Sequence, residues 1–228
     1  MPTIIYTIIT PSTAARPRAL FAAIASVAQA HQTLTATDAP DAHVEMLIGY
    51  DGVTGPRVAP DGAPAPDFVR FYDLPHDGDY GNAIRHTLLR ASRGTHVIFL
   101  DDDNALTPDA LRIHYAARHA DLHIAPIDTS RAFPNVPQLP VHDPAKPLVR
   151  PTNIDPLCIC ATRDLVVTRC GGWTSTGGYE ADYVNILKYS RRAHSTIVSD
   201  AIVGIYDAGN GLDSTGVNWR QAAKEKKE

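Results

Sequence analysis

Apolar and polar positions along the first half of the chain alternate between two spacings. Short β-branched and apolar runs, typical of buried strands, cover residues 3–10, 44–50, 68–72, 97–100 and 122–127. Between them, apolar residues recur every three or four positions and predict helices over 17–32, over 80–92 and from Thr107 onward. This alternation predicts an α/β fold whose central sheet is mostly parallel and is flanked by helices.

Local signals fix where these elements begin and end. Ser12 or Thr13 is expected to cap the first helix, and Thr107, followed by proline and aspartate, the third. Asp51 and Gly52 form a turn signal after the second strand, and Gly94 is a natural stop for the second helix.

The second half of the chain is less regular. Residues 128–157 are rich in proline and predict a long functional loop. A strand at 157–161, a short helix or turn at 162–168, a helix at 180–189 and a strand region at 196–206 follow. The glycine-rich stretch 207–216 suits a lid, and 222–228 form a charged tail. Because the chain shows no repeat and no linker, we expect one domain over 1–221, with halves at 1–127 and 128–221.

Composition excludes several classes of protein. Apolar residues make up 44% of the chain, charged residues 20%, and the net charge is −4, so there is no basic signal for a nucleic-acid partner. No apolar run approaches the roughly 20 residues of a membrane span, and the N-terminus lacks a basic leader. Three cysteines favour reduced thiols. We expect a cytoplasmic protein, free or peripheral to a membrane, and leave its oligomeric state open.

Polar and acidic residues gather where the predicted strands end. Thr10, Asp51 and Asp101 all occupy such positions, where ligands of open α/β sheets bind. Asp101, Asp102 and Asp103 follow one another directly, and adjacent like charges repel unless a positive group lies among them. Carboxylates suit Mg²⁺ or Mn²⁺, and the strand parity pairs Asp101 with Asp103 while Asp102 points away.

Other readings of this cluster remain. The acids could cap the next helix, but Thr107 and Asp109 already serve that end, or they could form a solvated polar turn. A phosphatase of the haloacid-dehalogenase type also ends a strand in D-x-D. That family needs a hydroxyl residue four positions after the first aspartate, where this chain has Ala105.

Four separated stretches resemble the glycosyltransferases of the GT-A fold, in particular the inverting family 2. They are TPSTAARPRALFAAIASVAQ, IGYDG, GNAIRHTLLRASRGTHVIFLDDDNALTPDAL and GGWTSTGGYEADYVNILKY, and together they span most of residues 3–190. The positions that match the family are Arg16, Leu20, Ser26, Gln29, Arg85, Gly94, Asp101, Asp103, Leu106 and Pro108.

The resemblance implies a role for each matching residue. Those expected to bind the nucleotide sugar are Thr10, Pro11, Ser12, Arg16, Asp51, Arg85, Asp101 and Asp102. Asp103 is expected to bind Mn²⁺ or Mg²⁺, with Asp101 and Asp207 as further metal ligands. The catalytic base is expected at Asp182, with Glu180 as the alternative. Gly172 and Trp173 are expected to bind the acceptor, although a core role for this tryptophan is an equal reading.

The chain also departs from the family. The family's acid pair is adjacent, whereas Ala181 separates Glu180 from Asp182, so the register of the base stays open by one or two residues. Ala14 and Ala15 replace a tyrosine and an asparagine, and His86 stands where asparagine is common.

The expected function is metal-dependent transfer of a sugar, with inversion, from a UDP- or GDP-sugar. The acceptor is expected to be a carbohydrate or glycolipid hydroxyl, as in polysaccharide biosynthesis. A nucleotidyltransferase of related fold is the first alternative, although TPSTAARPR lacks the glycines that grip a triphosphate. A non-catalytic nucleotide-sugar-binding domain is the second.

Overall fold

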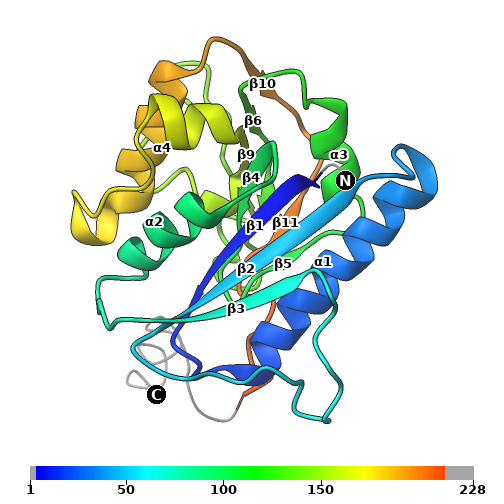
Figure 1. Ribbon diagram of the computed structural model, residues 1–228. Coiled ribbons are helices and arrows are strands. Elements are labelled where there is room, and N and C mark those ends of the chain that lie inside the picture. Colours follow the sequence, from blue (N-terminus) through cyan, green and yellow to red (C-terminus); the bar gives the residue numbers. More distant parts are fainter. Residues whose placement is uncertain (1–3, 214–228) are drawn as a thin grey trace.

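The computed structural model describes residues 4–213, in which strands and helices alternate through the first half of the chain (Figure 1). The helices are α1 (Pro17–Thr37), α2 (Asn82–Ala91), α3 (Ala110–Ala116) and α4 (Ala181–Arg192), with single turns η1 (Pro156–Cys158) and η3 (Gly178–Glu180) and a π-helical turn η2 (Asp164–Arg169). The strands are β1 (Ile4–Ser12), β2 (His43–Asp51), β3 (Val69–Leu74), β4 (His96–Phe99), β5 (Ala105–Leu106), β6 (Leu122–Ile124), β7 (Ile127–Asp128), β8 (Gln138–Leu139), β9 (Ile159–Thr162), β10 (Thr196–Val198) and β11 (Gly204–Ile205).

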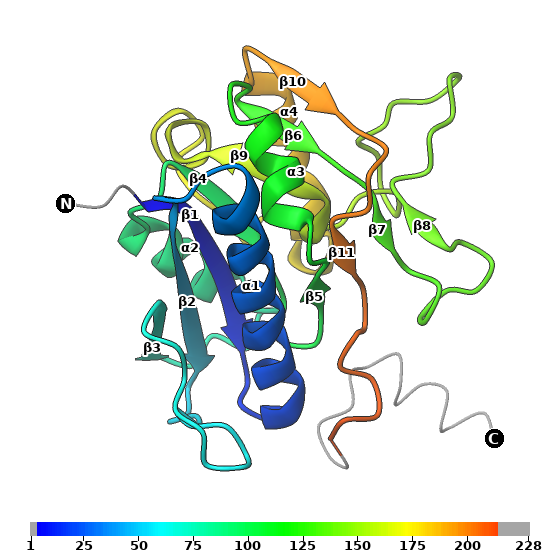
Figure 2. The same ribbon diagram turned by 90° about the vertical axis from the view of Figure 1, so that its right-hand side faces the viewer.

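The main sheet has seven strands in the order β10-β6-β9-β4-β1-β2-β3. All neighbours are parallel except β9, which runs antiparallel between β4 and β6. Figure 2 shows α1 and α3 in front of this sheet, with α2 behind it. The prediction of a mostly parallel sheet flanked by helices is therefore confirmed.

Two predicted strands divide between sheets. The run 122–127 gives β6 in the main sheet and β7 in a second, four-stranded sheet ordered β5-β11-β7-β8, and 196–206 divides likewise into β10 and β11. These two segments leave the main sheet side by side, where Val203 N–H donates to the carbonyl of Pro126 at 2.8 Å. The predicted loop 128–157 contributes β8 to this second sheet.

Several predicted helix ends are wrong, two of them because the predicted capping hydroxyls bond to residues far away in the chain. The N-cap residues of α1 and α3 are Arg16 and Asp109, and neither makes a side-chain cap. The predicted caps are engaged elsewhere: the Ser12 hydroxyl donates to Asp102, and the Thr107 hydroxyl donates to the carbonyl of Ile202. Helix α1 continues to Thr37, since Leu34 extends its buried face beyond Val27.

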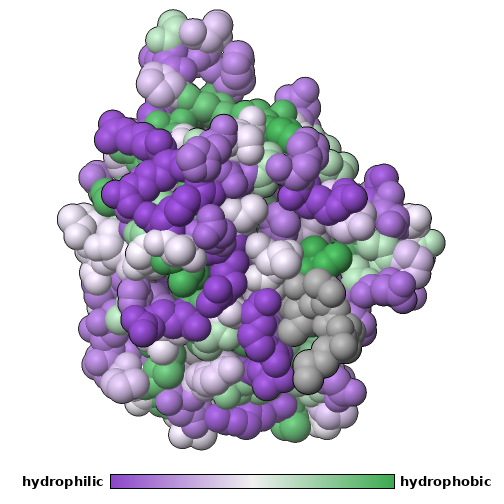
Figure 3. Space-filling view, turned by 45° about the horizontal axis from the view of Figure 1, so that its top comes forward, coloured by the Kyte–Doolittle hydropathy of each residue, from purple (hydrophilic) through white to green (hydrophobic). Residues whose placement is uncertain are grey.

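The face of the molecule shown in Figure 3 is largely polar. Hydrophilic residues predominate on it, and hydrophobic ones form small patches. In the part of the chain from 4 to 213, no helix has the length and apolar character required to cross a bilayer.

Candidate functional site

The carboxyl ends of three neighbouring strands bring the predicted polar residues to one edge of the sheet. Strands β4, β1 and β2 are adjacent and parallel, and the arrowheads of β1 and β2 point the same way in Figure 2. The loop after β1, the end of β2 and the Asp101–Asp103 turn after β4 therefore lie at the same edge. This is where an open α/β sheet binds its ligands.

One arginine pairs with two of the three consecutive aspartates. Arg16 places Nη2 2.5 Å from Asp102 Oδ1 and Nη1 2.5 Å from Asp103 Oδ2. The Ser12 hydroxyl also donates to Asp102 Oδ2 at 2.5 Å. The repulsion foreseen from the sequence is thus relieved by a guanidinium from the N-terminus of α1.

Asp102 is an internal anchor rather than a surface ligand. Its side chain is 2% exposed, and burial, together with Asp103 and Asp101, raises its pKa to about 6 against the opposing effects of Arg16 and Ser12. The expectation that Asp102 contacts the nucleotide sugar is not supported, because its oxygens are turned inward onto Ser12 and Arg16. It fixes the turn that carries Asp101 and Asp103.

A second, buried arginine, Arg85, pairs with Asp101. Arg85 on α2 is 3% exposed and places Nη2 2.5 Å from Asp101 Oδ1, while Nη1 donates to the carbonyl of Tyr80 at 2.8 Å. Its guanidinium carbon lies 5.3 Å from the centre of the Trp173 ring. Within the described residues its Nε has no hydrogen-bond partner.

Arg85 and Asp101 also affect the pKa values of two further carboxylates, those of Asp182 and Asp155. Burial raises the pKa of Asp182 in the first turn of α4 to about 6, with Arg85 opposing and Asp101 reinforcing the shift. Burial also raises the pKa of Asp155 to about 7, reinforced by Asp101 and Asp182. Asp155 precedes η1 and accepts a hydrogen bond from Leu157 N–H at 2.9 Å. Three carboxylates thus share the field of one buried guanidinium.

The two predicted bases differ in their surroundings. Asp182 is partly buried and interacts electrostatically with Arg85 and Asp101, whereas Glu180 is exposed at the end of η3. The structure therefore brings Asp182 to the acid–arginine cluster.

The predicted acceptor residues lie in the core. Trp173 is 3% exposed, packs 4.8 Å from Phe99 between ring centroids, and donates from Nε1 to Asn82 Oδ1 at 2.8 Å. Gly172 is buried, and its carbonyl accepts from Lys188 Nζ and the Tyr189 hydroxyl. The sugar-platform reading of Trp173 is corrected, because neither face of its ring is open.

The other predicted nucleotide residues lie at the ends of β1 and β2. Thr10 is fully buried, and its hydroxyl has no hydrogen-bond partner among the described residues. Pro11 lies against Gly81, where an added Cβ would come within 2.7 Å of the Pro11 Cβ. Asp51 accepts N–H bonds from Asp77 and Gly78 and so holds the loop before α2.

The described part of the predicted lid crosses the aspartate turn. Asp207 N–H donates to Asn104 Oδ1 and Gly209 N–H to the carbonyl of Asp103, both at 2.8 Å. The segment ends at Asp213, whose carboxylate accepts the N–H groups of Arg18 and Ala19 at the start of α1. Residues 214–216 of the predicted lid and the predicted tail 222–228 lie outside the described residues.

A divalent cation fits this site only in part. Between residues 4 and 213, no three histidine, cysteine or acidic side chains are arranged to hold a metal, so Asp101, Asp103 and Asp207 form no ready three-residue cage. Mg²⁺, however, usually takes one or two carboxylates and completes its shell with water and substrate phosphates. Two hard carboxylates on one turn meet that requirement.

No protein-family model and no curated protein sequence matches the chain. Solved structures do. S. aureus TarS 1–349 superposes with a TM-score of 0.65 at 13% identity, over 89% of this chain and 60% of that one. The same protein in complex with UDP-GlcNAc gives 0.60 at 13% identity, over 89% and 58%.

A mannosyltransferase, PcManGT from Pyrobaculum calidifontis in complex with GDP-Man and Mn²⁺, gives 0.54 at 15% identity, over 90% of this chain and 57% of that one. The fold is GT-A. At these identities the similarity establishes the GT-A fold alone, and the chain spans about 60% of the length of the first of these structures.

The GT-A site contains residues that sequence reasoning missed. Asp155 carried no recognised motif; its only signal was an acid–proline pair at the end of the proline-rich stretch. Asp213 caps α1 from 194 residues away, which no local pattern announces.

Proposed function

We propose that this protein is a glycosyltransferase, similar to the inverting family 2 enzymes, that moves a sugar from a nucleoside-diphosphate sugar to a hydroxyl acceptor. One observation carries the proposal: the Asp101–Asp103 turn, two arginines and Asp182 converge at the carboxyl edge of a GT-A sheet. The structural neighbours include complexes with UDP, UDP-GlcNAc and GDP-Man, which supports a UDP- or GDP-linked donor.

The donor binds in this proposal along the turn after β4 and the loop after β1. Asp101 holds the ribose in this proposal, and Thr10, whose buried hydroxyl has no hydrogen-bond partner among the described residues, ends the neighbouring strand β1. Arg16 and Arg85 supply positive charge at the edge that receives the diphosphate. Charge-assisted hydrogen bonds from guanidinium groups to phosphate oxygens are strong and directional.

A divalent cation, Mn²⁺ or Mg²⁺, is proposed at the D-x-D aspartates. Asp103 would be its principal ligand, with Asp101 and Asp207 as further ligands, and the remaining positions would be left for water and the donor. Such a cation neutralises charge on the leaving diphosphate. The Mn²⁺ in the complex of the mannosyltransferase neighbour supports this assignment.

Asp182 takes the proton of the attacking hydroxyl in this proposal. With a pKa of about 6 it is ionised at neutral pH, yet it is a stronger base than an ordinary aspartate. Arg85 opposes the effect of burial on the pKa of Asp182 and so favours the charged carboxylate, and it also pairs directly with Asp101. Attack from the face opposite the diphosphate inverts the anomeric centre.

The setting we propose is cytoplasmic, with a carbohydrate or glycolipid acceptor of the kind used in polysaccharide biosynthesis. All three cysteines are free and buried, which supports a reducing compartment. In this arrangement residues 1–127 bind the donor, and residues 128–221 carry the base and most of the acceptor site.

Calorimetry with UDP and GDP, each with and without MnCl₂, tests the proposal. We expect at least one nucleotide to bind in a metal-dependent manner, and Asp103→Ala to lose most of that dependence. Asp109→Ala, which alters an exposed acid six residues later, is the matched control and keeps it. Equal binding by wild type and Asp103→Ala would contradict the metal assignment, and no binding of either nucleotide would contradict the function.

A further inference from the structure

Two tyrosines stand exposed beside the acid–arginine cluster. Tyr80 is 64% and Tyr179 54% exposed, and their rings meet edge to face with centroids 5.6 Å apart. In the described part of the chain, no other tyrosine, phenylalanine or tryptophan is exposed. Large aromatic side chains are usually buried at least in part, so two that lie together in solvent mark a binding surface.

The backbone holds both rings in this position. Tyr80 has φ 51°, a left-handed conformation that costs a residue with a side chain about 1 kcal/mol and tends to persist at functional sites. Its carbonyl accepts from Arg85 Nη1 at 2.8 Å. Tyr179 lies in the short turn η3, and Asn82 Nδ2 donates to the carbonyl of Gly178, which joins that turn to the start of α2.

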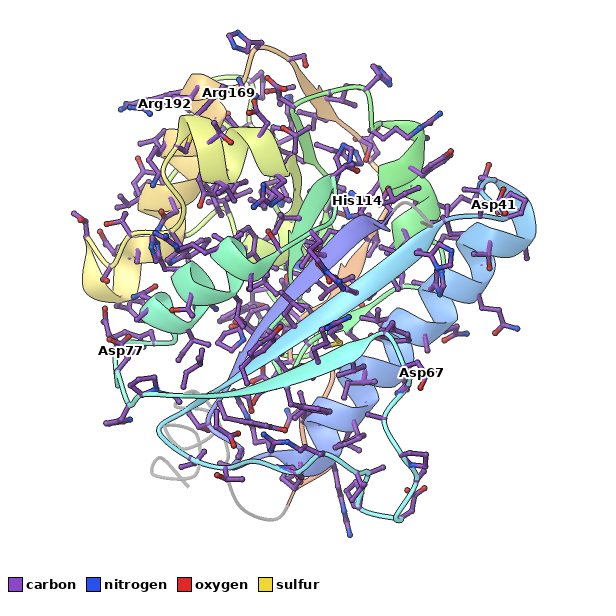
Figure 4. The ribbon with its side chains drawn as sticks, viewed as in Figure 1. Asp41, Asp67, Asp77, His114, Arg169 and Arg192 are labelled. Atoms are coloured by element: carbon purple, nitrogen blue, oxygen red, sulfur yellow. The ribbon has the colours of Figure 1, made fainter. Side chains whose placement is uncertain are left out.

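The pair lies between the proposed donor and acceptor sides. Tyr80 is linked through Arg85 to Asp101, and Tyr179 precedes Asp182 by three residues. Figure 4 shows Asp77 on the loop that leads to α2, next to the turn that precedes α4. Both rings therefore stand on segments that also carry groups of the acid–arginine cluster.

The neighbouring charges restrict what the rings receive. Asp79 precedes Tyr80, Glu180 follows Tyr179, and Asp77 is exposed on the same loop. Carboxylates accept hydrogen bonds from sugar hydroxyls but repel phosphates and uronates. Aromatic rings offer flat apolar faces that match the C–H face of a pyranose.

We propose that Tyr80 and Tyr179 form the acceptor platform and that it receives an uncharged carbohydrate. This rests on the proposed function and names the acceptor class of the same site. These two tyrosines, rather than Trp173, then provide the aromatic surface for the acceptor sugar, since Trp173 is buried while their rings are exposed to solvent.

Saturation-transfer NMR with four neutral tetrasaccharides (malto-, cello-, chito- and mannotetraose) and tetragalacturonate as the anionic probe tests the platform. We expect wild type to bind at least one neutral sugar and to bind the anionic probe more weakly. Tyr179→Ala should weaken that binding about tenfold, while Tyr179→Phe, which keeps the ring face, should retain it. Tyr80→Gly should weaken it similarly, and glycine accepts the left-handed backbone there without strain.

Tyr115→Ala on α3 is the control, because that ring packs on Arg118 on the opposite face of the sheet. It should bind as wild type does, and melting curves verify that each variant is folded. Wild-type affinity in both tyrosine variants, an equal loss in Tyr179→Phe and Tyr179→Ala, a preference for tetragalacturonate, or no neutral sugar bound would each overturn the platform. Metal-dependent UDP or GDP binding by wild type would then show that the platform alone has failed.

Discussion

Arg16 holds Asp103 through a contact of 2.5 Å between Nη1 and Oδ2, although the two residues lie 87 positions apart. A cation that binds Asp103 must compete with this guanidinium. Asp102 and Asp103 are thus already paired with a cationic side chain without a metal, and Arg16 has to release Asp103 before a cation binds there.

Arg16→Met should therefore raise the affinity for Mn²⁺ in the absence of nucleotide, by about three- to tenfold, because it removes the competing positive charge. The same variant should melt at a lower temperature, since buried Asp102 loses its ion-pair partner. Calorimetric titration with MnCl₂ and a melting curve measure the two effects. Arg18→Met, which removes an exposed arginine two residues away, is the control, and an unchanged or weaker Mn²⁺ affinity in Arg16→Met would contradict the competition.

Asp155→Asn should stabilise the protein at high pH. In the fold the pKa of Asp155 is about 7, above that of an unfolded aspartate near 4, so the folded state increasingly disfavours the ionised form as pH rises from about 4 to 7. Asparagine never ionises, and the variant should gain on the order of 4 kcal/mol over wild type at pH 8, where the whole pKa shift counts, and about a third of that at pH 5.

Urea denaturation of wild type and Asp155→Asn at the two pH values measures this difference. Asp67→Asn, an exposed acid on the loop before β3, should change little at either pH. A stability difference that stays constant between pH 5 and pH 8 would show that burial of the Asp155 charge is not its source.

Trp173→Phe separates a core residue from a sugar platform. The substitution removes the indole N–H that Asn82 Oδ1 accepts and leaves that buried oxygen unpaired, at a cost of about 1–3 kcal/mol. We expect a melting temperature lowered by several degrees and an acceptor KM within about twofold of wild type. A raised acceptor KM with unchanged stability would restore Trp173 to the acceptor site.

The alternation of strand and helix was predictable because the spacing of apolar residues along each of these segments is typical of its own type of element. Strands β1 and β2 are apolar runs, and the buried face of α1 recurs through Leu20, Ala23, Ile24 and Val27. The carboxyl-edge position of Asp101 follows from the parallel order alone. These features depend on local sequence and on general rules of parallel sheets.

The missed features depend on contacts between distant residues. Ser12 was expected to cap a helix, but its hydroxyl is taken by Asp102, 90 residues later. The position of Asp155 depends on a fold of the proline-rich stretch that has no periodicity. Tyr80 and the N-cap Gly81 are both left-handed, so α2 begins only at Asn82, and Arg85 Nη1 donates to the carbonyl of Tyr80.

The identity of the base is the central claim, and the sequence leaves it between two acids. The structure favours Asp182, because it shares the field of Arg85 with Asp101, whereas Glu180 is exposed. The wild-type rate should then fall as pH drops through about 6, where the Asp182 carboxylate becomes protonated.

The most direct test measures sugar transfer and nucleotide binding in Asp182→Asn and Glu180→Gln side by side. We predict that Asp182→Asn loses at least a hundredfold in transfer while it binds UDP or GDP as wild type does, and that Glu180→Gln stays within a few-fold of wild type. An active Asp182→Asn together with an inactive Glu180→Gln would contradict the account.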